Sequence, residues 1–265
     1  MHPFRYHRAI DIPDAIAAVQ DSSDGKFLAG GQTLLASLKL RLAQPECLVD
    51  LRRLQELRGI SISRSALTIG AMTTHAEVAA SEEVRQVLPA LASLAGGIGD
   101  PMVRHVGTLG GSVANSDPAA DYPAALLALD AVVVTSTRRL AAHAFFLGLF
   151  ETALQPGELI KEVEFPLPRR AAYVKFKHPA SRFALVGVFV ADTASGPRVA
   201  VTGAGATVFR VEEMERALAE RFAPESLEGI EVDSAPLNSD LQATADYRAH
   251  LVGVIARRAV AEAVV

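Results

Sequence analysis

Two glycine-rich segments carry the residue types that could hold an anionic ligand. The first is Ala29-Gly30-Gly31-Gln32-Thr33, and the second is Gly107-Thr108-Leu109-Gly110-Gly111-Ser112. A Gly-Gly step can turn at positive φ and lets a ligand approach the main chain without meeting a Cβ. Successive N–H groups in such a turn form a concavity that suits an anion, above all a pyrophosphate. The pair predicts two facing loops that grip a dinucleotide, without the spacing of the Rossmann fingerprint.

Carboxylates and histidines are the other candidate groups. Asp121 stands just before Pro123 and is predicted to cap a helix at its N-terminus. Asp117 precedes Pro118 and suits the cap of a turn. His75, His105 and His143 have no carboxylate or thiol partner at metal spacing, so neither a metal site nor a catalytic residue is expected.

Composition and charge exclude several classes of protein. The formal net charge of −4 leaves no basic excess for nucleic acid. Cys47 is the only cysteine, which excludes an internal disulfide and fits a reducing compartment. The N-terminus has no apolar core typical of a signal peptide, and the apolar stretches 124–135 and 183–191 are too short to span a bilayer. A cytoplasmic protein without a membrane span is expected.

The first glycine segment is predicted to join a strand to a helix. Residues 26–29 have the pattern of a strand. Thr33 is expected to cap the following helix, because Leu34, Leu35, Leu38 and Leu42 fall on one helical face. Pro45 should stop that helix, and 47–51 is the next predicted strand.

The pattern of elements changes after the linker candidate 166–170. Before it, we predict strands at 67–70 and from 132 onward, and helices at 74–80, 81–94 and 124–131. Pro89 should divide the helix at 81–94. The second glycine segment is predicted to be a loop at 107–112. After it, we predict an antiparallel meander of strands at 173–177, 184–191 and 198–202, then helices at 211–222 and 245–263. This is an α+β chain with a larger N-terminal unit and a smaller C-terminal one.

The ordered set of motifs resembles the FAD-binding medium subunit of molybdenum hydroxylases, the group of aerobic carbon monoxide dehydrogenase and xanthine dehydrogenase. The motifs are 29–33, Asp50-Leu51, 69–74, 103–112, 117–121, Phe145-Phe146, 152–154, 156–159, Tyr247-Arg248 and 257–260. They cover nearly the whole chain in order.

The resemblance implies a fold and a set of partners. Residues 1–167 would form a two-lobed FAD-binding domain of the vanillyl-alcohol-oxidase type, with a small lobe over roughly 1–52 and a larger one over 53–167. Residues 168–265 would form the C-terminal domain of carbon monoxide dehydrogenase flavoproteins. A molybdopterin-containing large subunit would oxidise the substrate, and a 2Fe-2S small subunit would pass electrons to this FAD and on to an outside acceptor, in a heterotrimer that could dimerise.

The resemblance also implies the residues that contact FAD. They are Ala29, Gly30, Gly31, Gln32, Thr33, Leu34, Leu35, Ile98, Thr108, Leu109, Gly110, Gly111, Ser112, Ala114, Asp117, Asp121, Leu159 and Lys177. Both glycine segments would hold phosphates, Asp121 would lie near the adenosine ribose, and Lys177 would place a positive charge near the isoalloxazine.

Each of these roles has a structural alternative. Thr108 could satisfy only backbone groups, Asp117 could cap only a turn, Leu159, Ile98 and Ala114 could be core, and Lys177 could be a solvated strand lysine. The alternative function is a flavin-free binding or assembly protein with the same fold. A self-sufficient reductase of the enolpyruvyl sugar-nucleotide type lacks support, because we find no catalytic Ser/Glu arrangement.

Overall fold

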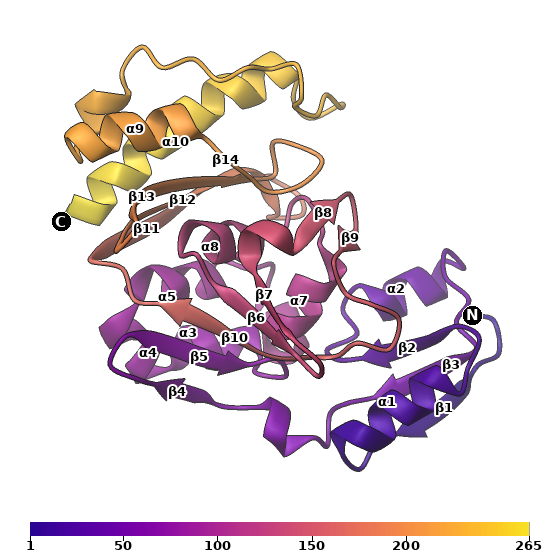
Figure 1. The fold of residues 1–265 in the computed structure, drawn as a ribbon. Coiled ribbons are helices and arrows are strands. Elements are labelled where there is room, and N and C mark those ends of the chain that lie inside the picture. The colour runs from indigo at the N-terminus through magenta and orange to yellow at the C-terminus, as the bar shows by residue number, and fades with distance from the viewer. Residues whose placement is uncertain (265) are drawn as a thin grey trace.

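A small lobe built on parallel strands begins the chain (Figure 1). The computed structural model describes residues 1–264. The lobe contains β1 (Arg5–Arg8), α1 (Ile12–Gln20), β2 (Gly25–Leu28), α2 (Leu34–Lys39) and β3 (Cys47–Asp50). All three strands are parallel, in the order β1-β3-β2. Each residue of the central strand β3 is buried, because two strands flank it and helix α1 packs Ala15 and Val19 into the same apolar cluster as Val49.

The second lobe consists of a five-stranded antiparallel sheet and a group of short helices. Its strands are β4 (Ile60–Ile62), β5 (Ala66–Gly70), β6 (Val132–Thr135), β7 (Arg139–Ala141) and β10 (Ile160–Pro166), in the order β4-β5-β10-β6-β7. Its helices are α3 (His75–Ala80), α4 (Glu82–Val87), α5 (Pro89–Gly96), α6 (Pro101–Val106), α7 (Leu109–Asn115) and α8 (Tyr122–Ala128). A separate hairpin joins β8 (Phe146–Gly148) to β9 (Glu151–Thr152).

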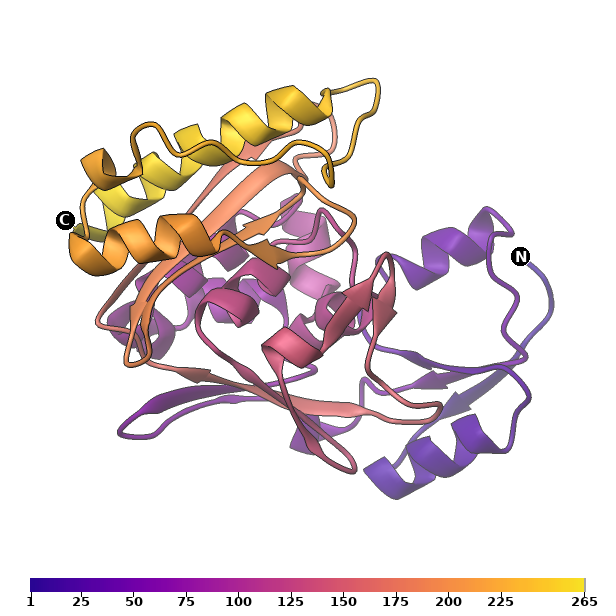
Figure 2. The ribbon, with the colours of Figure 1, turned by 45° about the horizontal axis from the view of Figure 1, so that its top comes forward.

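The C-terminal part places a four-stranded antiparallel sheet between two layers of helices (Figure 2). Its elements are β11 (Arg170–Lys177), β12 (Ala184–Thr193), β13 (Gly196–Thr202), β14 (Phe209–Arg210), α9 (Glu212–Glu220) and α10 (Ala245–Val264). Side chains alternate along β12. Val188 and Val190 pack toward α9 and α10, whereas Phe189 and Ala191 join the core of the second lobe. Strand β12 is therefore buried throughout.

The α+β prediction is confirmed, and most predicted elements are present with shifted ends. The division at Pro89 separates α4 from α5, and the C-terminal meander is antiparallel. The predicted C-terminal domain ends at Val265, which lies outside the described residues. Within residues 1–264, no helix is both long and apolar enough to cross a membrane.

Three predictions about α2, the helix after the first glycine segment, are wrong. Thr33 makes no side-chain cap to α2, because its backbone is already in the helical region. The helix ends at Lys39, well before Pro45, and Leu42 is 77% exposed rather than part of a buried stripe.

Candidate functional site

The first glycine segment lies directly against the second lobe. A Cβ on Gly30 would stand 2.4 Å from the carbonyl oxygen of Val106 and 2.8 Å from the Cα of Gly107. Contact at that distance is possible only for a residue without a Cβ. Gly31 follows with φ of +69°, a conformation that glycine adopts without strain. Gly30 therefore allows the close contact between the two lobes, and Gly31 allows the turn.

A run of backbone N–H groups along this segment has no protein acceptor. Among residues 1–264, none of the N–H groups from Gly30 to Leu34 donates a hydrogen bond to another part of the chain. Leu35 is the next donor, to the carbonyl of Gly31 at 3.0 Å. Gln32 and Thr33 are exposed beside these groups. Consecutive free donors of this kind suit an anion with several oxygens.

The second glycine segment is the first turn of helix α7 rather than the loop that we predicted. The Thr108 hydroxyl accepts from the N–H of Gly111 at 3.2 Å and caps the helix. Gly110 donates its N–H to Ala71 at 2.8 Å, and a Cβ on Gly110 would stand 2.5 Å from that of Ala71. Gly110 and Gly111 have negative φ, so they serve close packing and not a positive-φ turn.

The two segments meet. Gly30 contacts the backbone at Val106 and Gly107, and a Cβ on Gly111 would lie 3.5 Å from the Cβ of Ala29. Figure 1 shows α7 beside the loop that enters α2. The Ser112 hydroxyl makes no hydrogen bond within the described part of the chain. The structure thus brings together the residues that the sequence placed in two distant motifs.

The predicted cap by Asp121 is wrong. Asp121 precedes α8, but its carboxylate makes no cap hydrogen bond. Tyr173 donates its hydroxyl to Oδ1 at 2.5 Å, and the Nζ of Lys175 donates to both oxygens at 2.8 and 3.0 Å. Burial raises the pKa of Asp121, while the charge of Lys175 opposes that shift. Asp117 does cap a turn, since its Oδ1 accepts from the N–H of Ala119 at 2.9 Å.

The remaining predicted contacts lie in different surroundings. Ile98 is half-buried, and Arg104 donates to its carbonyl at 3.0 Å. Ala114 is exposed on α7. Leu159 is 5% exposed and belongs to the core of the first lobe. Lys177 is exposed at the end of β11, next to a register shift.

Sequence reasoning missed Lys175 and Tyr173, which touch Asp121 directly. A signal was available, because residues 173 and 175 alternate onto one face of a strand that we had predicted. His75, to which the sequence assigned neither a metal nor a catalytic role, is buried, and its ring would stand 2.8 Å from a Cβ on Gly107. Burial, aided by the charge of Arg104, lowers the pKa of His75 to about 4. His75 is therefore a neutral packing partner of the second segment at neutral pH.

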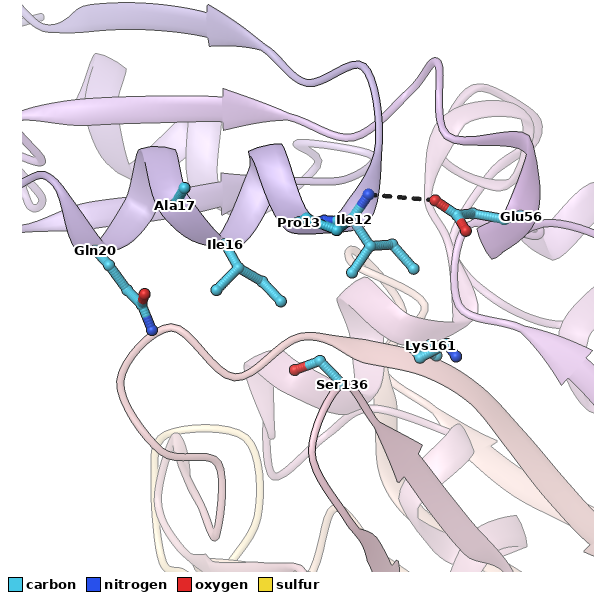
Figure 3. A pocket seen from close by; sticks show the side chains of 8 residues that line it. All are labelled: Ile12, Pro13, Ile16, Ala17, Gln20, Glu56, Ser136 and Lys161. Carbon is cyan, nitrogen blue, oxygen red and sulfur yellow. Dashed lines mark hydrogen bonds between the residues drawn. The ribbon is translucent and has the colours of Figure 1, made fainter.

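A groove of about 550 Å³ lies elsewhere, between α1 and strand β10 (Figure 3). It is lined by Ile12, Pro13, Ile16, Ala17, Gln20, Glu56, Ser136 and Lys161. It contains none of the predicted cofactor residues. Within residues 1–264, His, Cys, Asp and Glu side chains form no cluster of three or more that could hold a metal ion.

Two family models match this chain. One, described as the FAD binding domain in molybdopterin dehydrogenase, matches residues 2–168. The other, described as the CO dehydrogenase flavoprotein C-terminal domain, matches residues 171–263.

Individual proteins match over nearly their full length. The carbon monoxide dehydrogenase medium chain of Hydrogenophaga pseudoflava is 36% identical, covering 97% of this chain and 95% of that protein. The xanthine dehydrogenase FAD-binding subunit of Escherichia coli O157:H7 is 28% identical, with 98% and 95% covered. A solved structure of reconstituted CO dehydrogenase from Oligotropha carboxidovorans superposes with a TM-score of 0.91 at 32% identity, covering 99% of this chain and 98% of that one.

Proposed function

Because this chain belongs to the family of FAD-binding medium subunits of molybdenum hydroxylases, we propose that it carries FAD between residues 29–35 and 108–112 and serves as the electron-carrying subunit of a larger oxidoreductase. The family matches confirm the resemblance, FAD as the cofactor and the oxidoreductase class. The observation that carries the proposed site is the run of unpartnered N–H groups from Gly30 to Leu34 beside α7.

The residues present fit a pyrophosphate at this position. Gly30 and Gly31 have no side chain to cover the main chain, and each free N–H can donate to a phosphate oxygen. The Ser112 hydroxyl, which makes no hydrogen bond within the described residues, would add a donor from α7, and the Thr108 hydroxyl, which accepts from Gly111, keeps its own proton to donate. We keep Ile98, Ala114, Asp117, Asp121, Leu159 and Lys177 as proposed contacts for the rest of the cofactor.

Bound FAD would supply the redox chemistry, taking electrons from the iron–sulfur clusters of a partner subunit and giving them to an external acceptor. The printed names of the relatives, medium chain and FAD-binding subunit, support assembly with other chains. We propose a molybdopterin-containing large subunit and a 2Fe-2S small subunit as those partners, in the cytoplasm. This chain alone would not oxidise the substrate.

The proposed domains are residues 1–167 and 168–265. The two family models, which meet between residues 168 and 171, support this division. The alternative, a flavin-free binding or assembly protein, has less support, because within the described residues the N–H groups of residues 30–34 have no protein acceptor.

Reconstitution with partner subunits tests the electron-carrying role. The three purified subunits are mixed with and without FAD, and reduction of an artificial electron acceptor is followed after adding the substrate of the large subunit. We expect acceptor reduction that requires both this chain and FAD. Equal reduction without FAD would contradict the proposal and favour the assembly role.

A further inference from the structure

The segment from Asp117 to Asp121 is held by the C-terminal sheet, far along the chain. The Thr202 hydroxyl lies 2.9 Å from the carbonyl oxygen of Pro118 and 2.6 Å from that of Ala120. The N–H of Gly203 donates to the same Pro118 carbonyl at 2.7 Å. These contacts join a segment of the proposed cofactor site to the end of β13.

A buried ion pair makes a second connection between the same parts. The side chains of Lys175 and Asp121 are each 4% exposed, and Lys175 bonds both carboxylate oxygens. Tyr173 adds a hydrogen bond to Oδ1. Gly187 leaves room for this arrangement, since a Cβ there would stand 2.4 Å from the Tyr173 hydroxyl. Breaking a buried pair by removing one partner is costly, because the other charge stays buried without compensation.

Other residues contact the groups that make these two connections. Arg248, 3% exposed on α10, donates to the carbonyls of Gly203 and Leu185. On the opposite side, the Cε of Lys175 lies 3.9 Å from the position of a Cβ on Gly97, the neighbour of Ile98. Lys175 therefore pairs with one segment of the proposed site, at Asp121, and lies near a second one, at Gly97.

We propose that Lys175 is a positioning residue of the cofactor site: through its ion pair with Asp121 it holds residues 117–121 in the conformation that receives the cofactor. The inference rests on the proposed function and deepens it, since it makes FAD retention depend on the C-terminal sheet. Lys177, whose charge also lowers the pKa of Asp121, is exposed at the strand end and makes no hydrogen bond to Asp121 within the described residues, so the direct contact belongs to Lys175.

A double-mutant cycle on the full-length chain tests this role. The variants are Lys175→Met, Asp121→Asn and both together, with Lys161→Met, an exposed lysine on β10, as the matched control. The dissociation constant for FAD is measured from the change in flavin fluorescence, and the thermal midpoint is recorded for each variant. We expect Lys175→Met to raise the dissociation constant by about tenfold or more, and Lys161→Met to leave it unchanged.

The cycle separates positioning from general stability. In the Asp121→Asn background, Lys175→Met should have little further effect on FAD affinity, because the two residues act as one unit. The double variant should regain thermal stability, as it lacks an unpaired buried charge, yet stay weak in FAD binding. Additive effects, or FAD affinity that returns together with the thermal midpoint, would overturn the inference.

Three further outcomes are decisive. If Lys175→Met alone does not fold, FAD affinity is measured in the double variant and in Tyr173→Phe instead. Wild-type FAD affinity in both of these variants would overturn the inference. If the wild-type chain itself binds no FAD, the proposed site and the inference fail together. Tight binding by wild type and Lys175→Met alike would overturn the inference alone.

Discussion

At the scale of single residues, the proposed site depends on where a Cβ is absent. Gly30 faces the carbonyl of Val106 at a distance that no side chain tolerates, and Gly31 has positive φ. The sequence identified both as ligand-binding candidates, and the structure adds the reason that Gly30 is needed. It lets the first lobe pack against the second, which brings the segment with the free N–H groups close to the start of α7.

A substitution at this contact should abolish flavin binding. Gly30→Val places carbon atoms into the Val106 carbonyl, so the two segments must separate and the N–H groups lose their alignment. We expect FAD affinity to fall by about a hundredfold or more, or roughly 3 kcal/mol, measured by flavin fluorescence titration.

Gly96→Ala is the matched control for that substitution. A Cβ on Gly96 would meet only the Cβ of Ala79, at an ordinary 3.8 Å. Its FAD affinity should equal that of the wild-type chain. Equal losses in both variants would show that Gly30 has no specific role at the site.

At the scale of elements, a buried carboxylate holds the turn between β6 and β7. Glu158 accepts hydrogen bonds from Arg138, Thr135, Thr137 and the N–H of Gln155. The ion pair with Arg138, together with the other donors, lowers the pKa of Glu158 from 4.5 to about 2 despite burial. The turn is thereby fixed to the loop that leads into β10.

This depressed pKa predicts how stability depends on pH. The ionised carboxylate should stabilise the fold by about 3 kcal/mol above pH 4.5, and this contribution should be lost as the pH falls toward 2. Urea midpoints of wild type and Glu158→Gln should therefore differ clearly at pH 7 and much less at pH 3. An equal difference at both pH values would contradict the assigned ion pair.

Element ends were harder to predict than the elements themselves. The run 107–112 was expected to be a loop, because a Gly-Gly step can turn at positive φ and lets a ligand approach the main chain. Tertiary contacts decide otherwise, since Thr108 caps the turn and Gly110 packs on Ala71. Likewise Asp121 looked like a helix cap, and only the approach of β11 explains its pairing with Lys175. Neither contact follows from local sequence.

At the scale of the whole molecule, two of the three parts share one core. Tyr173, Phe189 and Ala200 of the C-terminal sheet belong to the same apolar cluster as Leu91 and Tyr122 of the second lobe. The sequence predicted the order of the elements and the family correctly. It could not show this shared core. The apolar residues of β12 indicate that both faces of the strand are buried, but they do not indicate which elements cover each face.

The shared core predicts that the N-terminal part needs the C-terminal sheet. A chain that ends after Leu167 would expose the face of α5 and α8 that β11 to β13 cover. We expect it to bind a hydrophobic fluorescent dye, to be cut rapidly by protease and to lose cooperative thermal unfolding, unlike the full-length chain. Cooperative unfolding of residues 1–167 would contradict a shared core.

The most direct test of the proposed FAD site is the visible absorbance spectrum of the full-length chain after incubation with FAD and passage through a desalting column. We expect flavin bands that elute with the wild-type and Gly96→Ala chains and are absent from Gly30→Val. Loss of the flavin from the wild-type chain, or retention by Gly30→Val at the wild-type level, would contradict an FAD site between residues 29–35 and 108–112.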